Sequence, residues 1–206
     1  MDKKDLLQSL KKRGIPENVI DAFSKVDRED FVPRELQKMA YEDSPLPISK
    51  GQTTSQPYTI AFMLAHLDVK KGQKVLEIGS GSGYALAIMA ELIGSKGRAF
   101  GIERIPELER RSKKSLADYR NVNVYNRNGI NGLEEFAPFD RIMISAALRE
   151  IPEKIMGQLK NKGLLVAPKG SRFDHEIFVI QRKSGKEFEV KQRIPGFVFV
   201  PFIYED

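Results

Sequence analysis

The sequence of 206 residues contains no cysteine and no tryptophan, and only two histidines, His66 and His175. Without cysteine, the chain forms no disulfide, carries no thiol nucleophile and offers no sulfur ligand to zinc. The two histidines lie far apart in the chain and lack the HExxH spacing of a zinc hydrolase, so we interpret both as packing or surface residues. We therefore expect no metal centre, although a magnesium site made only of carboxylates stays open.

Long apolar runs are also missing. The longest stretch without Asp, Glu, Lys or Arg spans residues 51–67, and a run of Thr, Ser and Gln interrupts it. A membrane span needs about 20 mostly apolar residues, so we expect no membrane partner. Residues 1–5 are mostly charged and predict the start of a helix rather than a signal peptide. We expect a cytoplasmic protein.

Basic residues outnumber acidic ones, with 34 Lys and Arg against 28 Asp and Glu, which gives a formal net charge of +6. Such an excess permits binding of nucleic acid or of an acidic substrate. The densest basic stretch, residues 104–114, is interspersed with Glu107 and Glu109, a pattern typical of a solvated helix face. We therefore expect no nucleic-acid partner, and we expect a monomer.

The order of apolar and turn-forming segments predicts an α/β protein. Residues up to about 40 have helical periodicity, whereas residues 41–58 are rich in Pro, Gly, Thr and Ser and predict a long ordered loop with little regular structure. Strands and helices then alternate. The predicted strands are residues 74–78, 98–103, 122–125, 140–145 and 164–167, and the predicted helices are residues 59–67, 84–93, 106–119 and 152–159. This alternation predicts a Rossmann-like, doubly wound, mainly parallel sheet with N-terminal helices ahead of it.

The end of the chain has a different pattern. Residues 176–182 and 187–193 are strand-like and flank the turn sequence at 183–186, which predicts a C-terminal antiparallel hairpin added to the sheet. At roughly 150 residues per domain, the length suits one domain. We expect three parts within it: a helical lead-in and active-site loop over 1–58, a cofactor-binding α/β core over 59–170, and a β extension over 171–206.

A glycine-rich segment, EIGSGSGY at residues 77–84, follows the first predicted strand. Glycines at a strand-to-helix turn let the backbone approach a ligand, and the free N–H groups of the next helix bind it. The spacing departs from the dinucleotide pattern GxGxxG, because Tyr84 stands where that pattern needs Gly or Ala. Glu103 ends the second predicted strand, placed to accept hydrogen bonds from both hydroxyls of a ribose. Together with Glu77, it favours a nucleotide-like cofactor without a pyrophosphate over a simple tight connection.

These residues resemble motif I and the acidic strand end of class I S-adenosylmethionine-dependent methyltransferases. Over nearly its whole length, the chain more narrowly resembles the protein-L-isoaspartate O-methyltransferase family. The matching segments are residues 30–33, 40–48, 51–57, 74–84, 102–108, 132–141 and 198–201. The segment GQTTSQP at 51–57 is the specific one, because other methyltransferases share the glycine loop but not this loop upstream of it.

The resemblance implies S-adenosyl-L-methionine as cofactor and isoaspartyl-containing proteins and peptides as partners. The enzyme would methylate the α-carboxylate of an L-isoaspartyl residue, and the ester would collapse to a succinimide that can reopen to normal aspartate. A carboxylate with a pKa of about 3.3 to 3.9 is already ionised at pH 7, so the reaction needs no general base. Catalysis then rests on aligning carboxylate, methyl and sulfur within about 3 to 3.5 Å and on excluding water.

The resemblance also implies which residues form the site. Ser55 is the implied catalytic residue, whose hydroxyl would bind the substrate carboxylate, and Thr54 and Asp43 join it in substrate binding. The implied cofactor-binding residues are Thr53, Glu77, Gly79, Ser80, Gly81, Gly83, Glu103, Arg104, Asn128 and Gly129. Two structural alternatives stay open: Ser55 and its Thr neighbours can cap the helix that Pro57 starts, and Asp43 can tie its loop to backbone N–H groups.

The sequence departs from the family pattern near the implied site. Arg127 and Asn128 stand where the family has Gly and Asp, so an uncharged amide oxygen would bind adenine, and Arg127 either clashes or points outward. Leu148 and Arg149 stand where a small residue and Pro are usual. Two further hypotheses therefore stay open: a cofactor-binding protein whose reaction is altered, or a methyltransferase for another acceptor such as RNA. The sequence SAAL at 145–148, where RNA methyltransferases often carry an NPPY-type motif, argues against amino-group methylation.

Overall fold

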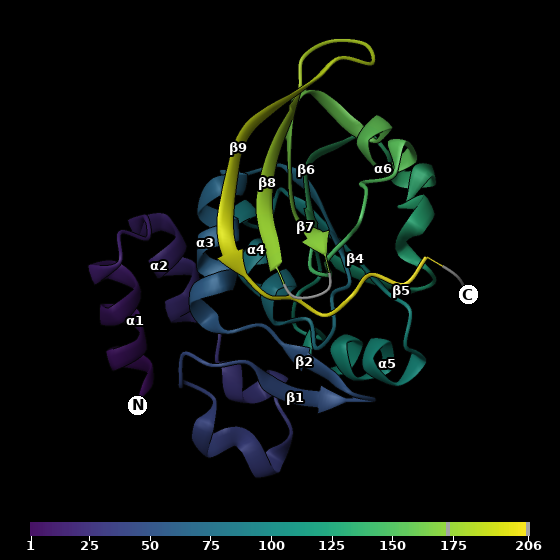
Figure 1. Ribbon diagram of the computed structural model, residues 1–206. Helices are drawn as coiled ribbons and strands as arrows, with labels where there is room; N and C mark the ends of the chain where they lie inside the picture. The colour runs from purple at the N-terminus through teal and green to yellow at the C-terminus, as the bar shows by residue number, and fades with distance from the viewer. Residues whose placement is uncertain (172–173, 205–206) are drawn as a thin grey trace.

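The computed structural model describes residues 1–171 and 174–204, and a seven-stranded sheet in the order β5-β4-β3-β6-β7-β8-β9 forms its centre (Figure 1). The strands are β3 (Lys74–Ile78), β4 (Arg98–Glu103), β5 (Val122–Asn126), β6 (Phe139–Ile144), β7 (Leu159–Ser171), β8 (Asp174–Arg182) and β9 (Phe188–Phe197). β3 to β7 pair in parallel, whereas β8 pairs antiparallel with both β7 and β9. The predicted fold class and its C-terminal antiparallel hairpin are confirmed.

Helices cover both faces of this sheet. They are α1 (Lys3–Lys12), α2 (Glu17–Lys25), α3 (Pro57–Leu67), α4 (Tyr84–Ile93), α5 (Pro106–Ser115) and α6 (Glu153–Gly157). Short 3-10 helices connect the larger elements: η1 (Arg28–Phe31), η2 (Arg34–Met39), η3 (Gly129–Asn131) and η4 (Glu134–Phe136). Side chains of α1 to α4 pack on one face, and those of α6 and the segments around η3 and η4 pack on the other. Within the described ranges, no helix is long and apolar enough to cross a membrane.

Strand β3 illustrates why this sequence forms a central parallel strand. It pairs with β4 on one side and β6 on the other, and helices cover both of its faces, so apolar residues are needed in both directions. Val75 packs into the helical cluster of α1 to α4, while Leu76 and Ile78 pack into the opposite cluster. Glu77 is the exception, because it is the one charged residue among the four buried residues of β3.

The carboxyl ends of the parallel strands face one edge of the sheet. A small hairpin of β1 (Leu46–Ser49) and β2 (Gln52–Thr54) lies beyond this edge, and the C-terminal tail crosses it (Figure 1). Ala147 fixes the tail there, since its N–H donates to the Val200 carbonyl and its carbonyl accepts from the Phe202 N–H, each at 2.8 Å. Open α/β sheets bind their ligands at this edge.

The structure corrects several predicted boundaries. The expectation of little regular structure over 41–58 is wrong, because β1 and β2 form an antiparallel pair. β7 is longer than the predicted strand 164–167, since its pairing with β8 continues to Ser171. α6 is shorter than the predicted helix 152–159, because β7 already begins at Leu159. α5 ends at Ser115 instead of 119, where Leu116 turns inward against the glycine loop.

Candidate active site

The glycine loop connects β3 to α4 at the carboxyl edge of the sheet. Gly79 and Gly83 have φ values of 83° and 87°, which favour glycine, and a Cβ on Gly83 would lie 2.8 Å from Leu116 Cδ1. The N–H groups of Gly79 and Ser80 both donate to the Ile102 carbonyl on β4, at 2.8 and 3.0 Å. The loop is therefore fixed to the end of β4.

Glu103 ends β4 and lies buried against this loop. Its Oε2 accepts a hydrogen bond from the Gly81 N–H at 2.9 Å, and its Oε1 accepts one from the Ile105 N–H at 2.8 Å. Burial raises the pKa of the Glu103 carboxyl, and the bonds from the Ile105 and Gly81 N–H groups oppose that rise. Each oxygen keeps a lone pair, so the carboxylate can still accept hydrogen bonds from two ribose hydroxyls.

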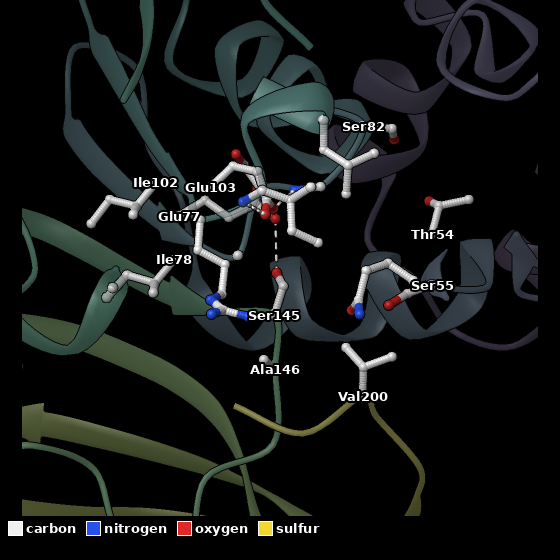
Figure 2. A pocket seen from close by; sticks show the side chains of 18 of the residues that line it. Thr54, Ser55, Glu77, Ile78, Ser82, Ile102, Glu103, Ser145, Ala146 and Val200 are labelled. Atoms are coloured by element: carbon white, nitrogen blue, oxygen red, sulfur yellow. Dashed lines mark hydrogen bonds between the residues drawn. The ribbon is translucent and has the colours of Figure 1, made fainter. Parts of the chain in front are cut away.

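Glu77 is the second buried carboxyl of the site. Its side chain is only 2% exposed, and its Oε1 accepts a hydrogen bond from Ser145 Oγ at 2.8 Å (Figure 2). Its Oε2 has no hydrogen-bond partner within the described part of the chain. Burial raises the pKa of Glu77 to about 8, although the bond from Ser145 lowers it. A buried carboxyl with one free oxygen fits a ligand that brings a positive charge.

A cavity of about 200 Å³ collects these groups. Its walls come from the glycine loop, from residues 52–55, 128–129 and 145–146, and from residues 200–203 of the C-terminal tail. The expected cofactor-binding residues that line it are Thr53, Glu77, Gly79, Ser80, Gly81, Glu103, Arg104, Asn128 and Gly129. Gly83 is not among the lining residues, and it supports the loop from behind, against Leu116.

One end of the cavity is formed by Asn128 and Gly129. A Cβ on Gly129 would lie 2.3 Å from Ile78 Cγ2, so only glycine lets this segment pack directly against the end of β3. Asn128 Oδ1 accepts a hydrogen bond from the Ile130 N–H at 3.0 Å and caps η3. Its amide oxygen is an acceptor, the type of group that binds an adenine amino group.

The other departures from the family pattern lie outside this cavity. Arg127 points outward, where its Nη1 bonds Glu135 Oε1 at 2.7 Å. Leu148 is fully buried in the core, and the Arg149 N–H donates to the Tyr204 hydroxyl at 2.8 Å. Arg127, Leu148 and Arg149 are all absent from the described lining of the cavity. They therefore leave the space for a cofactor unobstructed.

A second space, a cleft of about 690 Å³, adjoins the first. Its wall is largely aromatic, with Tyr58 and Phe62 from α3 and Phe197 and Phe199 from the end of β9 and the tail. The Phe62 ring centroid lies 5.8 Å from that of Tyr58 and 5.3 Å from that of Phe197. Arg13 also lines the cleft, with its guanidinium carbon 3.1 Å from the Tyr58 ring centroid.

Thr53, Ser55, Ser145 and Val200 line both the cavity and the cleft. Figure 2 shows Ser55, Ser145 and Val200 gathered on one side of the cavity. A molecule in the cavity and a molecule in the cleft would meet between these residues, which we call the junction. None of the four side chains ionises near neutral pH. The junction therefore suits a reaction that depends on alignment rather than on proton transfer by the protein.

The contacts around α3 bear on the alternatives for Ser55 and Asp43. The N-cap of α3 is Gln56, with no side-chain cap hydrogen bond. Asp43 supplies the missing acceptor, since its Oδ1 accepts from the Tyr58 N–H at 2.8 Å while its Oδ2 bonds Arg13 Nη1 at 2.7 Å. Asp43 thus ties its loop to the backbone of α3, and the described lining of both spaces does not include it.

The remaining expected residues lie as follows. Thr54 is buried and lines the cavity. His66 Nδ1 lies 2.9 Å from the Phe62 carbonyl on its own helix. His175 is buried in β8, and its Nδ1 accepts a hydrogen bond from the Phe199 N–H at 3.1 Å. Both histidines therefore have packing and backbone contacts.

The sequence analysis missed Ser145 and Arg13 as lining residues. Ser145 ended a predicted parallel strand, and position at the carboxyl end of such a strand is the signal that would have found it. Arg13 gave no comparable signal, because its contacts with Asp43 and Tyr58 join residues far apart in the sequence.

Comparisons with known proteins agree on one family. The model of the family described as protein-L-isoaspartate(D-aspartate) O-methyltransferase matches residues 1–205. A protein-L-isoaspartate O-methyltransferase of Methanothrix thermoacetophila is 44% identical over 205 residues, which cover 98% of this chain and 95% of the relative. One from Fervidobacterium nodosum is 42% identical over 198 residues, covering 95% and 98%.

The fold of the chain is also similar to a solved structure of this family. The protein described as a protein-L-isoaspartate O-methyltransferase from Plasmodium falciparum, in complex with S-adenosyl-L-homocysteine, aligns with a TM-score of 0.87. The two sequences are 27% identical, and the alignment covers 100% of both chains.

Proposed function

The chain belongs to the protein-L-isoaspartate O-methyltransferase family, and on that premise we propose that it methylates the α-carboxylate of L-isoaspartyl residues in damaged proteins and peptides, with S-adenosyl-L-methionine as methyl donor. The observation that carries the proposal is the junction, where Ser55 lines both the cavity and the aromatic cleft. The resulting ester would close to a succinimide with loss of methanol, and hydrolysis of the succinimide would return part of the material to aspartate.

S-adenosyl-L-methionine supplies an electrophilic methyl group on a positively charged sulfur. Glu103 would hold the ribose hydroxyls, and Asn128 would accept from the adenine amino group. Glu77 would accept from the ammonium group of the methionine part, which gives its free Oε2 a partner. The support for this assignment is that all three acceptors line one cavity.

On the substrate side, the Ser55 hydroxyl would donate to one oxygen of the carboxylate and leave the other oxygen to attack the methyl group. The carboxylate is already ionised at neutral pH, with a pKa of about 3.3 to 3.9, so the protein need not remove a proton. Alignment supplies the catalysis, and the aromatic wall of Tyr58 and Phe62 excludes water. Thr54 remains a candidate contact from its position in the cavity wall, and Asp43 would act by fixing the loop that carries Ser55.

Several broader expectations belong to the same proposal. We propose that the chain acts as one domain and as a monomer in the cytoplasm. The support for one domain is that residues before 59, residues of the α/β core and residues of the C-terminal tail together line both spaces. We propose no nucleic-acid partner. α5 carries acidic residues in its first turn and basic residues in its last turn, and Lys113 pairs with Glu109 one turn away.

The test uses S-adenosyl-L-methionine labelled in its methyl group and two peptides that differ only in Asp against L-isoAsp at one position. The proposal predicts base-labile label on the isoAsp peptide and background label on the Asp peptide. Equal and negligible label on both peptides, from a protein that binds S-adenosyl-L-homocysteine, would rule out the proposed activity.

A further inference from the structure

Arg28, the first residue of η1, carries a buried charge behind the active-site loop. Its side chain is 0% exposed and is among the largest fully buried side chains of the protein. Burial lowers the pKa of its guanidinium, and nearby Tyr84 and Asp43 oppose that shift. Among the described residues, no carboxylate forms an ion pair with it. A buried guanidinium without a carboxylate partner is costly unless other groups satisfy its donors.

Backbone carbonyls of the active-site loop accept from both of its Nη groups, whereas the buried Nε has no hydrogen-bond partner in the described part of the chain. Arg28 Nη1 donates to the carbonyls of Ala40 and Glu42, at 2.9 and 3.1 Å. Its Nη2 donates to the carbonyls of Ser44 and Ser55, at 3.1 and 3.0 Å. In the sequence, three of these carbonyls precede the β1–β2 hairpin, and the fourth, that of Ser55, follows it. One planar guanidinium therefore holds the chain before the hairpin and the chain after it.

On its other side, Arg28 faces Tyr84, the residue that follows the glycine loop. Its guanidinium carbon lies 5.8 Å from the ring centroid of Tyr84. Tyr84 is the first residue of α4, directly after the glycine loop, and it lines the cofactor cavity. Phe31, from the same 3-10 helix as Arg28, packs its ring 5.6 Å from that of Tyr84. Arg28 thus lies between the loop that is expected to bind the substrate and the start of α4, which lines the cofactor cavity.

We propose that Arg28 is a positioning residue for methyl transfer, which fixes the Ser55 hydroxyl at the junction through the Ser55 carbonyl and the loop before β1. The inference rests on the proposed function of Ser55. Ser55 lies between β2 and the Pro57 start of α3, and its own carbonyl receives one of the four bonds. Loss of that bond frees the hydroxyl to move, and a displacement of about 1 Å can cost about a hundredfold in rate.

The variant Arg28→Lys separates position from charge. Lysine keeps the positive charge but gathers three donors on one nitrogen, so it cannot hold two pairs of carbonyls as a planar fork does. Arg141→Lys is the matched control. Arg141 is partly buried and, like Arg28, donates to backbone carbonyls, but it lies in the first half of β6, toward the end of the strand away from the site. The measurements are kcat and KM with an isoAsp peptide, together with the Kd for S-adenosyl-L-homocysteine.

For Arg28→Lys, we expect kcat/KM for the isoAsp peptide to fall by about tenfold to a hundredfold, with the Kd for S-adenosyl-L-homocysteine changed by less than about threefold. Arg141→Lys should change neither value. A purely structural residue would weaken cofactor binding and catalysis together. Unchanged kcat/KM in Arg28→Lys, or equal losses in both quantities, would overturn the proposal.

A double-variant cycle with Ser55→Ala tests the route of the effect. If Arg28 acts through the Ser55 hydroxyl, Arg28→Lys should cost little further activity once that hydroxyl is removed. Full additivity of the two losses would overturn the proposal.

Hydrogen exchange of the unaltered protein measures how often the loop opens. The measurement requires neither a folded variant nor an active enzyme. A clamped loop should open only with the β3 core, so amides at 44–55 that are hydrogen-bonded should exchange at rates near those of β3. Exchange of these amides by frequent local opening contradicts the clamp. Should the protein fail to methylate the isoAsp peptide, the proposed function falls, whereas this exchange measurement still decides whether the loop bonded to Arg28 is clamped.

Discussion

The buried carboxyl of Glu77 gives the most quantitative prediction, through the variant Glu77→Gln. Glutamine has nearly the same shape and its Oε1 can still accept the Ser145 hydrogen bond, but it cannot ionise. The ordinary pKa of the group is 4.5, and burial raises the pKa of Glu77 to about 8 in the folded protein. Between these values, the folded protein holds a proton that the unfolded chain has released.

Because the folded state binds more protons in this range, the free energy of unfolding of the cofactor-free protein falls as the pH rises from about 4.5 to about 8. The slope from this one group is about 1.4 kcal/mol per pH unit, with a total of about 5 kcal/mol as an upper limit. Glu77→Gln has no carboxyl at this position, so its free energy of unfolding lacks this pH-dependent contribution. Its free energy of unfolding should therefore exceed that of the natural protein increasingly toward pH 8.

Cofactor affinity should change with pH in the opposite direction to stability. A cationic ammonium group beside Oε2 favours the ionised carboxylate, so binding releases a proton below about pH 8, and affinity for S-adenosyl-L-homocysteine rises with pH. Glu77→Gln should bind more weakly at pH 8 and with less pH dependence. Urea unfolding at about pH 5.5, 6.5 and 7.5 measures the stability difference, and calorimetry in two buffers of different ionisation enthalpy measures the proton release. Parallel stability curves for the two proteins, with no proton release, would refute the account of Glu77.

Three further substitutions test the site. Ser55→Ala removes one hydrogen bond to a charged carboxylate, worth about 1.5 to 3 kcal/mol, so kcat/KM for an isoAsp peptide should fall about tenfold to a hundredfold in a steady-state assay. Gly129→Ala forces a methyl group to within 2.3 Å of the strand beneath it, so thermal unfolding should reveal a loss of about 1 to 3 kcal/mol, and cofactor affinity should fall. Asp43→Asn keeps the acceptor for the Tyr58 N–H and should preserve KM for the peptide, whereas Asp43→Ala should lose about 1 kcal/mol of stability.

Matched variants control these predictions. Ser24→Ala removes a hydroxyl that donates to the Asp21 carbonyl on α2, and it should leave turnover unchanged. Gly157→Ala places a methyl group where nothing lies within 4 Å, and it should be neutral. Full activity of Ser55→Ala would assign Ser55 to packing alone. A large rise in KM for Asp43→Asn would instead mean that the Asp43 charge contacts the substrate.

The sequence predicted best those features that depend on neighbouring residues. The glycine loop and the strand before it follow from local spacing, and Glu103 follows from its place at the end of the next strand. β1 was missed because Leu46-Pro-Ile-Ser49 is short and contains proline, so its strand conformation depends on pairing with β2. Pairing across the fold decides such segments, and local propensity does not.

The contacts that complete the site join residues distant in sequence. The bond from Ser145 to Glu77 depends on β6 lying next to β3, which the order of strands along the chain does not specify. Arg28 lies in a charged segment, where an exposed position is the usual expectation, and only the fold shows it buried under the active-site loop. The role of Asp43 likewise depends on the position of Arg13, the residue that caps the C-terminus of α1.

The central claim is that a substrate carboxylate meets the methyl donor at the junction. The most direct measurement is a crystal structure of the protein with S-adenosyl-L-homocysteine and a short L-isoAsp peptide. The account predicts the peptide along the aromatic cleft, with one α-carboxylate oxygen within about 2.6 to 3.2 Å of Ser55 Oγ and the other directed at the cofactor sulfur. A carboxylate bound outside the junction, with Ser55 free of it, would contradict the account.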